Sequence, residues 1–176
     1  MANPASTPSK SQLRKALRQT IRESAHDSAP ACAALEKWLR SHPALQTIAV
    51  YSPLPGEVDF SQILQNYPLV KWIYPRIQGH HLTFHPGCDL IPGTLGIHEP
   101  AHHSPEIPLL EIDAFICPGL AFDPTGHRLG RGRGFYDRLL AQARPDALKI
   151  GICFPFQIVP DTLPEPHDIQ MDTVLF

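Results

Sequence analysis

The segment Cys117–Arg138, which reads CPGLAFDPTGHRLGRGRGFYDR, decides how this chain is organised. It continues from an apolar strand predicted over residues 114–117 and leads into a helix predicted from Phe135 to about Ala143. Between them lies the Gly/Arg loop, Gly130–Gly134, in which three glycines alternate with two arginines. A loop between a strand and a helix is where α/β folds place their phosphate sites.

The Gly/Arg loop has the chemistry of a polyphosphate site. Glycine lets the backbone take positive φ and lets an anion approach the N–H groups. Arginine adds a permanent charge and a forked donor that suits phosphate oxygens. A helix beginning near Gly134 would point its positive end at the same place. The loop matches neither the GxxxxGK[ST] nor the GxGxxG motif, and the alternatives are a flexible surface loop or an Arg-Gly element for RNA.

Length and composition predict one soluble domain. The 176 residues, 43% hydrophobic and 18% charged, suit a single α/β domain over residues 9–176 after a disordered leader at 1–8. The net charge of −2 argues against a nucleic-acid partner, and no apolar run reaches the ~18 residues of a membrane span. The four cysteines form no CxxC pair. We therefore expect a cytoplasmic location, with Cys117 and Cys153 as buried reduced thiols.

Predicted strands and helices alternate along the chain. Helices are expected over residues 10 to about 24, 30–40, from an Asp59 N-cap to about 66, and 135 to about 143. Strands are expected over residues 47–51, 70–74, 82–84, 114–117, 148–154 and, at an edge, 172–176. Residues 95–100 have the composition of a turn-rich connection. This order predicts a three-layer α/β/α domain with a mostly parallel, mixed central sheet, Rossmann-like in type.

A basic stripe follows the first predicted helix. Lys10, Arg14, Arg18 and Arg22 recur every four residues beside an apolar stripe. Lys10 and Arg14 lie one turn apart near the helix start, where both would reach one polyphosphate. Arg18 and Arg22 are interpreted as a solvated face.

Two acids are candidates for ligand contacts. Asp137, in the first turn after the Gly/Arg loop, would either balance the helix dipole or hold Mg²⁺ together with phosphate oxygens, and its spacing favours neither. Glu57 follows the first strand, at the edge where α/β folds gather ligands, although a solvated acid is the commoner meaning. Tyr136 is either an aromatic residue of the core or a ligand contact, and the sequence favours neither role. The histidines between His80 and His103 lack the spacing of a zinc site.

The run Pro118–Arg138 closely resembles the signature of the 5-formyltetrahydrofolate cyclo-ligase (5,10-methenyltetrahydrofolate synthetase) family. That signature has Pro-Gly-x-Ala-Phe-Asp, then Gly-x-Arg-Leu-Gly, a Gly-rich turn and Tyr-Asp-Arg. The resemblance continues in order along nearly the whole chain. Its other matching positions are Lys10 and Arg14 in an N-terminal Lys-x-x-x-Arg, Glu57 after the first strand, Glu99-Pro100 after Gly96, and the closing segment 151–172.

The resemblance implies a carbon–nitrogen cyclo-ligase. Such an enzyme converts 5-formyltetrahydrofolate to 5,10-methenyltetrahydrofolate, with ATP as co-substrate, Mg²⁺ as cofactor, and ADP and phosphate as products. A formamide is a poor electrophile, so its oxygen is first phosphorylated to an iminium phosphate, which N10 then attacks. This transfer needs positioning and charge stabilisation rather than a protein nucleophile.

Site residues carried over by the resemblance fall into four groups. ATP contacts would come from Lys10, Arg14, Arg128, Leu129, Gly130, Arg131, Gly132, Arg133, Gly134, Phe135 and Tyr136. Folate contacts would come from Ser52, Glu57, Arg131, Gly132, Arg133, Gly134 and Phe135. Asp137 and Asp168 would be the metal ligands, and Arg131 and Lys10 the catalytic residues.

Some positions depart from the family pattern. Arg131 and Arg133 stand where many relatives have other residues, and Phe135 replaces a frequent tyrosine, which leaves a stacking role there but no hydroxyl.

The alternatives to the cyclo-ligase are another ATP- or phosphate-binding enzyme of similar fold, a catalytically silent homologue, and a non-catalytic nucleic-acid-binding module. The expected partners are the small-molecule substrates alone, with no nucleic acid and no membrane. The protein is expected to be a monomer.

Overall fold

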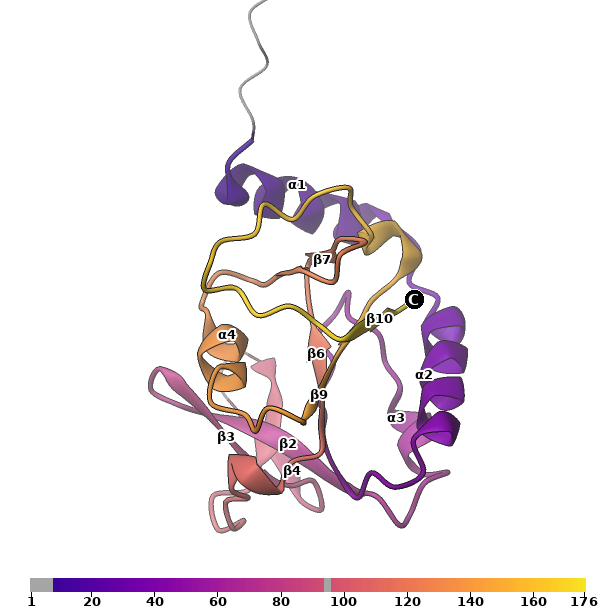
Figure 1. Ribbon diagram of the computed structural model, residues 1–176, viewed down its shortest axis with the longest axis vertical. Coiled ribbons are helices and arrows are strands. Elements are labelled where there is room, and N and C mark those ends of the chain that lie inside the picture. The colour runs from indigo at the N-terminus through magenta and orange to yellow at the C-terminus, as the bar shows by residue number, and fades with distance from the viewer. Residues whose placement is uncertain (1–7, 94–95) are drawn as a thin grey trace, which may run out of the picture.

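A six-stranded sheet forms the centre of this protein (Figure 1), in a computed structural model that describes residues 8–93 and 96–176. The strand order is β10-β9-β6-β1-β2-β3, and every neighbouring pair is parallel except β2 and β3. These strands are β1 Thr47–Ala49, β2 Lys71–Gln78, β3 His81–Pro86, β6 Ala114–Pro118, β9 Leu148–Ile152 and β10 Thr173–Leu175. The predicted mostly parallel, mixed sheet is confirmed.

Helices cover both faces of the sheet, because alternate strand residues point to opposite sides. In β6, Ile116 joins the core cluster that contains Leu35 of α2 (Ala29–Ser41). The next residue, Cys117, joins the other cluster with Leu139 of α4 (Phe135–Leu140). Figure 1 accordingly shows α2 and α4 on opposite sides of β6 and β9. The expected three layers are present.

Cys117 and Cys153 are buried free thiols, as predicted. Burial raises the pKa of each to about 12. Both are therefore protonated at neutral pH, and neither is a thiolate nucleophile.

Helix α1 (Lys10–Glu23) lies across the carboxyl ends of the parallel strands (Figure 1). The Ser9 hydroxyl accepts from the Gln12 N–H, and the Gln12 side chain accepts from the Ser9 N–H at 2.8 Å, so a capping box fixes its start. Leu17 and Ile21 pack against Leu120 and the two-stranded β7–β8 unit, β7 Ala121–Phe122 and β8 Arg128–Leu129. This packing places the basic side of α1 next to the Gly/Arg loop.

The ribbon β4–β5 is the largest difference from the sequence prediction. β4 (Leu90–Pro92) pairs antiparallel with β5 (His98–Pro100), so the expected turn-rich connection is wrong for residues 98–100. Strand β2 also continues past residue 74 to Gln78, because it pairs with β3 in register through Gln78 and His81. The β7–β8 unit was not predicted either.

Helix α3 is shorter than predicted. It spans Ser61–Leu64 with Phe60 as N-cap, and Asp59 instead accepts a hydrogen bond from the Ser61 N–H at 2.9 Å before the helix begins. The prediction that Asp59 is the N-cap was therefore wrong. Two 3-10 helices, Leu109–Glu111 and Pro155–Gln157, complete the described elements.

Within the described residues, no helix is both long and apolar enough to cross a membrane. The predicted leader at residues 1–8 lies, apart from Pro8, outside the described residues.

Asp113 ties together the entry points of neighbouring strands. Its Oδ2 accepts from the Gln46 and Thr47 N–H groups at 2.7 and 2.8 Å, and its Oδ1 accepts from Arg144 at 2.6 Å. Partial burial works to raise the carboxyl pKa, but these amides and the Arg144 charge outweigh it, so the pKa lies below the ordinary 3.8. The ionised form is thus the one that stabilises the fold.

We expect Asp113→Asn to lower the free energy of unfolding at pH 7 by about 1–3 kcal/mol, because strand amides lose a charged acceptor. A depressed folded-state pKa gives stability that is complete above the unfolded value of 3.8 and lost as the pH falls through the folded value. The deficit should therefore shrink in acid. Urea unfolding across pH measures it. Asp146→Asn, which removes the 75% exposed partner of Arg144, is the control and should change little; an equal deficit in both variants would contradict this account.

Candidate functional site

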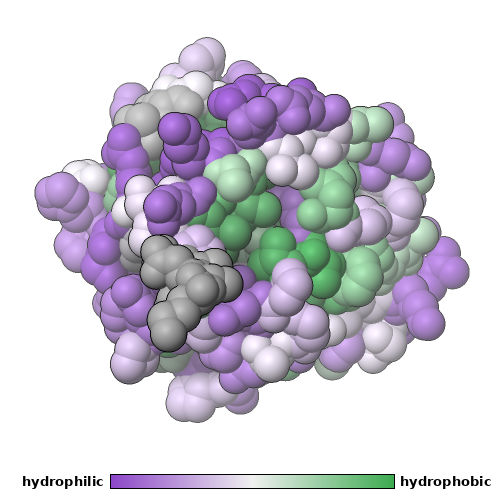
Figure 2. All heavy atoms as spheres, turned by 90° about the horizontal axis from the view of Figure 1, so that it is seen from above, coloured by the Kyte–Doolittle hydropathy of each residue, from purple (hydrophilic) through white to green (hydrophobic). Residues whose placement is uncertain are grey.

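One cavity of about 590 Å³ lies between α1, α4 and the carboxyl ends of the parallel strands. It is lined by every residue that the sequence analysis assigned to ATP, folate or metal: Lys10, Arg14, Ser52, Glu57, Arg128 to Asp137, and Asp168. Seen from above, the face that carries α1 shows polar residues around a smaller apolar area (Figure 2). The structure thus gathers residues from both ends of the chain into one compartment.

Two of the three glycines of the Gly/Arg loop are required by the backbone conformation. Gly132 has φ +101° and Gly134 has φ +63°, which a side chain would strain. Gly134 is also the N-cap of α4. Because α4 has only six residues and ends at Leu140, well before residue 143, its dipole adds little, and the positive charge comes from Arg and Lys side chains.

Helix α1 holds the Gly/Arg loop through the loop carbonyls. Arg14 Nε donates to the Gly130 carbonyl at 3.0 Å, and Arg18 Nη2 donates to the Arg131 carbonyl at 3.0 Å. Both arginines line the cavity. Arg18 is exposed, as a solvated face predicts, but its contact with the loop was not foreseen. Arg22 is exposed and makes no hydrogen bond or ion pair among the described residues.

Arg131 and Glu57 form an ion pair across the cavity. Arg131 donates from Nε and Nη2 to Glu57 Oε1 at 3.0 and 2.8 Å, while Glu57 Oε2 accepts from the Leu54 N–H at 2.9 Å. The Glu57 side chain is only 7% exposed but that of Arg131 is 42% exposed. Glu57 is therefore a fixed, buried carboxylate, and Arg131 is the partner that solvent and ligands can reach.

Arg128 anchors both ends of the Gly/Arg loop. Its side chain is 4% exposed, and Nη2 donates to Asp137 Oδ1 at 2.8 Å. Its guanidinium lies 5.3 Å from the Tyr136 ring centre, a cation–π distance. Burial around the Tyr136 phenol raises its pKa well above 10.0, so the hydroxyl stays protonated. Tyr136 is thus partly core and partly cavity wall.

Lys10 ties α1 to the C-terminal segment. Its ammonium lies 2.5 Å from Asp168 Oδ2 and 3.0 Å from Glu165 Oε2. Burial works to lower the pKa of Lys10, but these two carboxylates raise it overall. Burial likewise works to raise the pKa of Asp168, and the hydrogen bond from Lys10 lowers it. Both groups are charged at neutral pH.

The oxygen donors suit a magnesium ion, which prefers one or two carboxylates together with phosphate oxygens. Arg128 occupies Asp137 Oδ1, and Lys10 occupies Asp168 Oδ2. The second oxygen of each carboxylate accepts no hydrogen bond from the described residues, so both acids retain coordination capacity. Glu165 and His167 offer further ligand atoms within 4.8 Å of Asp168. Sequence reasoning missed these two, although both stand beside Asp168 in the chain.

An apolar compartment was also missed. Its walls include Pro75 and Ile77 of β2, Leu82 of β3, and Ile97, with the acid Glu99 among them. The strand prediction stopped at residue 74, so these side chains had no predicted place. The alternation of apolar residues at 73, 75 and 77 is the signal that would have extended β2.

These features define an α/β protein in which one cavity joins a cationic, glycine-rich loop to an acid-lined apolar compartment. The sequence pattern of the 5-formyltetrahydrofolate cyclo-ligase family matches residues 6–176. The chain belongs to that family.

Individual relatives are similar in sequence to this chain over most of their length. 5-Formyltetrahydrofolate cyclo-ligase of Mycoplasma pneumoniae is 31% identical over 145 residues, which cover 80% of this chain and 79% of the relative. The Escherichia coli K12 protein of the same name is 32% identical over 139 residues, 73% of this chain and 76% of its own.

Two solved structures share the fold. The 5,10-methenyltetrahydrofolate synthetase of Mycoplasma pneumoniae superposes with a TM-score of 0.78 at 27% identity, over 94% of this chain and 97% of its own. That of Aquifex aeolicus gives 0.80 at 28% identity, over 94% and 88%. The predicted fold class and family are confirmed.

We expect Lys10→Met to loosen the C-terminal segment, because Asp168 loses its cation. Amide hydrogen exchange over residues 165–168 should accelerate by roughly 5-fold or more, and the pKa of Asp168 should rise. Lys15→Met, at an exposed position of the same helix, is the control and should leave exchange unchanged. Equal exchange in both variants would show that Lys10 does not hold this segment.

Proposed function

We propose that this protein catalyses the ATP- and Mg²⁺-dependent conversion of 5-formyltetrahydrofolate to 5,10-methenyltetrahydrofolate, with release of ADP and phosphate. Family membership supports the reaction. The observation that carries the proposal for this chain is the single cavity, in which a cationic glycine loop and a buried carboxylate face each other across the Arg131–Glu57 pair. Two reacting substrates have to meet in one such compartment.

ATP would bind at the cationic side. Lys10 and Arg14 from α1 and the segment 128–136 would contact it, with the phosphates against the Gly/Arg loop. Glycine N–H groups and arginine forks both suit phosphate oxygens. Arg14 also positions the loop through the Gly130 carbonyl, so its contribution is partly structural.

The folate would bind between Ser52, Glu57 and residues 131–135. Glu57 would accept hydrogen bonds from the pterin N–H groups, since a carboxylate accepts two such bonds at once. Phe135, which lines the cavity, would provide a stacking surface. Arg131 stands between both substrates, because it touches Glu57 and belongs to the loop.

The reaction proceeds in two displacements. The formyl oxygen attacks the γ-phosphorus as the bond to ADP breaks, which gives an iminium phosphate. N10 then attacks the formyl carbon, the carbon–oxygen bond breaks, and phosphate leaves as N10 loses its proton. Arg131 and Lys10 would stabilise the charge that develops on the transferred phosphoryl group. No thiolate is required, which agrees with the raised pKa values of Cys117 and Cys153.

Asp137 and Asp168 would hold the magnesium ion, which supplies charge neutralisation at the phosphates. Arg128 and Lys10 orient these carboxylates, and Lys10 lowers the pKa of Asp168. We also expect a monomeric enzyme in the cytoplasm.

Absorbance of the methenyl product tests the proposal directly. It should appear only when ATP, Mg²⁺ and 5-formyltetrahydrofolate are all present, with one ADP formed per product. ADP release without methenyl product would indicate a different substrate. Steeply salt-dependent RNA binding without turnover would favour the nucleic-acid-binding alternative.

Arg131→Ala should lower kcat/KM by about 10²-fold or more, roughly 3 kcal/mol of transition-state stabilisation. Steady-state kinetics of product formation measure the effect. Arg22→Ala removes an exposed arginine outside the cavity and should retain full activity. Near-wild-type kinetics for Arg131→Ala would remove this residue from the site.

Asp137→Asn should raise the Mg²⁺ concentration that half-saturates ATP binding, because one anionic oxygen ligand is lost. Calorimetric titration of ATP at several Mg²⁺ concentrations measures this. Asp89→Asn, an exposed position outside the cavity, is the control. An unchanged magnesium requirement combined with a lower melting temperature would leave Asp137 only its structural pairing with Arg128.

A further inference from the structure

Glu99 is a buried acid whose charge has no partner in the described part of the chain. The residue is 7% exposed, and its Oε1 is covered and accepts no hydrogen bond. None of the ion pairs between described residues includes Glu99. A buried, unpaired carboxylate is costly, since its lost hydration is not replaced. Such a group calls for a ligand that supplies the missing donors.

The fold builds a place for this side chain. Glu99 sits in β5 opposite Ile91 of β4. Gly93 packs directly on it, since a Cβ at that position would come within 2.6 Å of the Glu99 side-chain carbons. The Gly93 N–H also donates to the Ile97 carbonyl at 2.8 Å, which closes the connection between the two strands.

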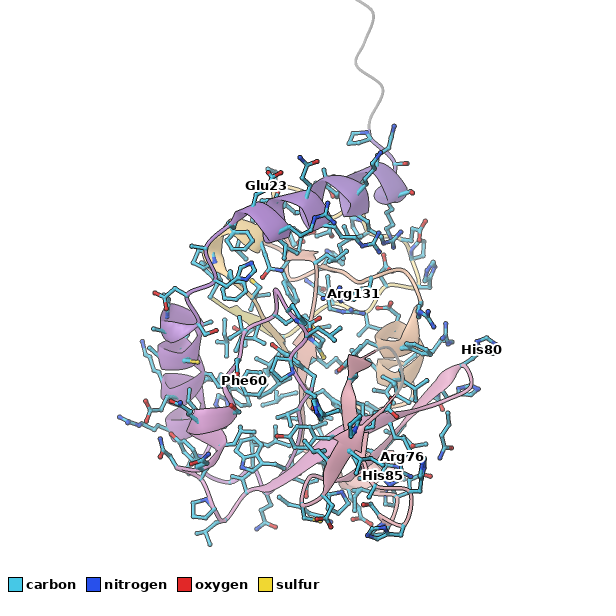
Figure 3. The ribbon with its side chains drawn as sticks, turned by 180° about the vertical axis from the view of Figure 1, so that it is seen from behind. Glu23, Phe60, Arg76, His80, His85 and Arg131 are labelled. Atoms are coloured by element: carbon cyan, nitrogen blue, oxygen red, sulfur yellow. The ribbon has the colours of Figure 1, made fainter. Side chains whose placement is uncertain are left out.

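A nearby arginine does not neutralise Glu99. Arg76 of β2 is buried, but it donates to the backbone carbonyls of Pro100 and Ala101 rather than to the Glu99 carboxylate. Figure 3 shows Arg76 well below the loop that carries Arg131, so the two guanidinium groups serve different ends of this region. Arg76 thereby fixes the backbone after Glu99 and leaves the carboxylate available.

Glu99 lines the apolar compartment of the cavity, together with Ile77, Leu82 and Ile97. Apolar walls around one buried carboxylate suit a flat heterocycle that carries adjacent N–H donors. Phosphates are the wrong ligand here, because a carboxylate repels them. The triphosphate of ATP is therefore excluded from this compartment on charge. The reduced pterin is the matching substrate part, because its pyrimidine ring carries adjacent N–H and NH₂ donors, whereas the amino group of adenine lies beside ring nitrogens that only accept.

We infer that Glu99 is a specificity-determining residue that accepts hydrogen bonds from the 2-amino pyrimidine edge of the pterin, in addition to the contacts of Glu57. Glu57 is already bonded to Arg131 and the Leu54 N–H, whereas neither oxygen of Glu99 accepts a hydrogen bond from the described residues. The pterin would then lie between two carboxylates, with its formyl group toward the Gly/Arg loop. This inference rests on the proposed function.

The test compares Glu99→Gln with wild type in ligand binding, which is independent of turnover. Calorimetric titration should show 5-formyltetrahydrofolate binding weakened by about 10- to 100-fold, since charged acceptors are lost, with ATP binding unchanged. An analogue without the 2-amino group should bind wild type more weakly than the parent compound does, and Glu99→Gln should no longer distinguish the two. Glu111→Gln, at an exposed position outside the cavity, is the matched control.

A structural role gives the opposite pattern. If Glu99 only supported the β4–β5 ribbon, ligand-free Glu99→Gln would have a lower melting temperature than wild type. It would still bind the analogue without the 2-amino group more weakly than the parent compound. Our inference expects an equal or higher melting temperature, because a buried unpaired charge is removed. Glu99→Met provides the same comparison if the Gln variant does not fold. If the wild-type protein binds no 5-formyltetrahydrofolate, the proposed function itself is overturned. If the wild-type protein turns over normally and Glu99→Gln binds 5-formyltetrahydrofolate as tightly as wild type, only this inference is overturned.

Discussion

The ion pair between Arg128 and Asp137 is the interaction on which the site depends. It joins β8 to α4 at 2.8 Å and closes the base of the Gly/Arg loop, whose residues lie between the two partners in sequence. Because the Arg128 side chain is almost fully buried, loss of either partner would leave an uncompensated charge, at a cost of about 3–5 kcal/mol. The loop therefore has fixed ends, and the contacts of Arg14 and Arg18 with its carbonyls restrain the residues between them.

The remaining parts of the cavity come from distant points of the chain. α1 crosses the open end of the sheet and holds the loop carbonyls through Arg14 and Arg18. The C-terminal segment reaches back to Lys10 through Asp168. Parallel strands make this possible, because all their carboxyl ends, with the segments that follow, lie at the same edge of the sheet.

Much of this arrangement was predictable from the sequence, and the failures share a cause. The first helix, the buried β6 and the Gly/Arg loop each have a strong local signal, so they were predicted correctly. The β4–β5 ribbon has strands of three residues, too short for a periodic pattern, and its pairing is decided by contacts with β2. Glu99 was noticed only as part of a family motif, since burial and the absence of a partner are properties of the folded chain. The contact of Arg18 with the Gly/Arg loop was missed for the same reason, because its acceptor is a backbone carbonyl in a remote loop.

The Arg131–Glu57 pair has a thermodynamic consequence for two ligands of opposite character. In the free chain each group neutralises the other. An anion that drew Arg131 away would leave the buried Glu57 carboxylate without its counter-ion, which would raise its attraction for N–H donors. By linkage, a ligand that binds Glu57 must raise the affinity for the anion by the same factor. The two halves of the cavity would thereby be coupled through a single shared counter-ion.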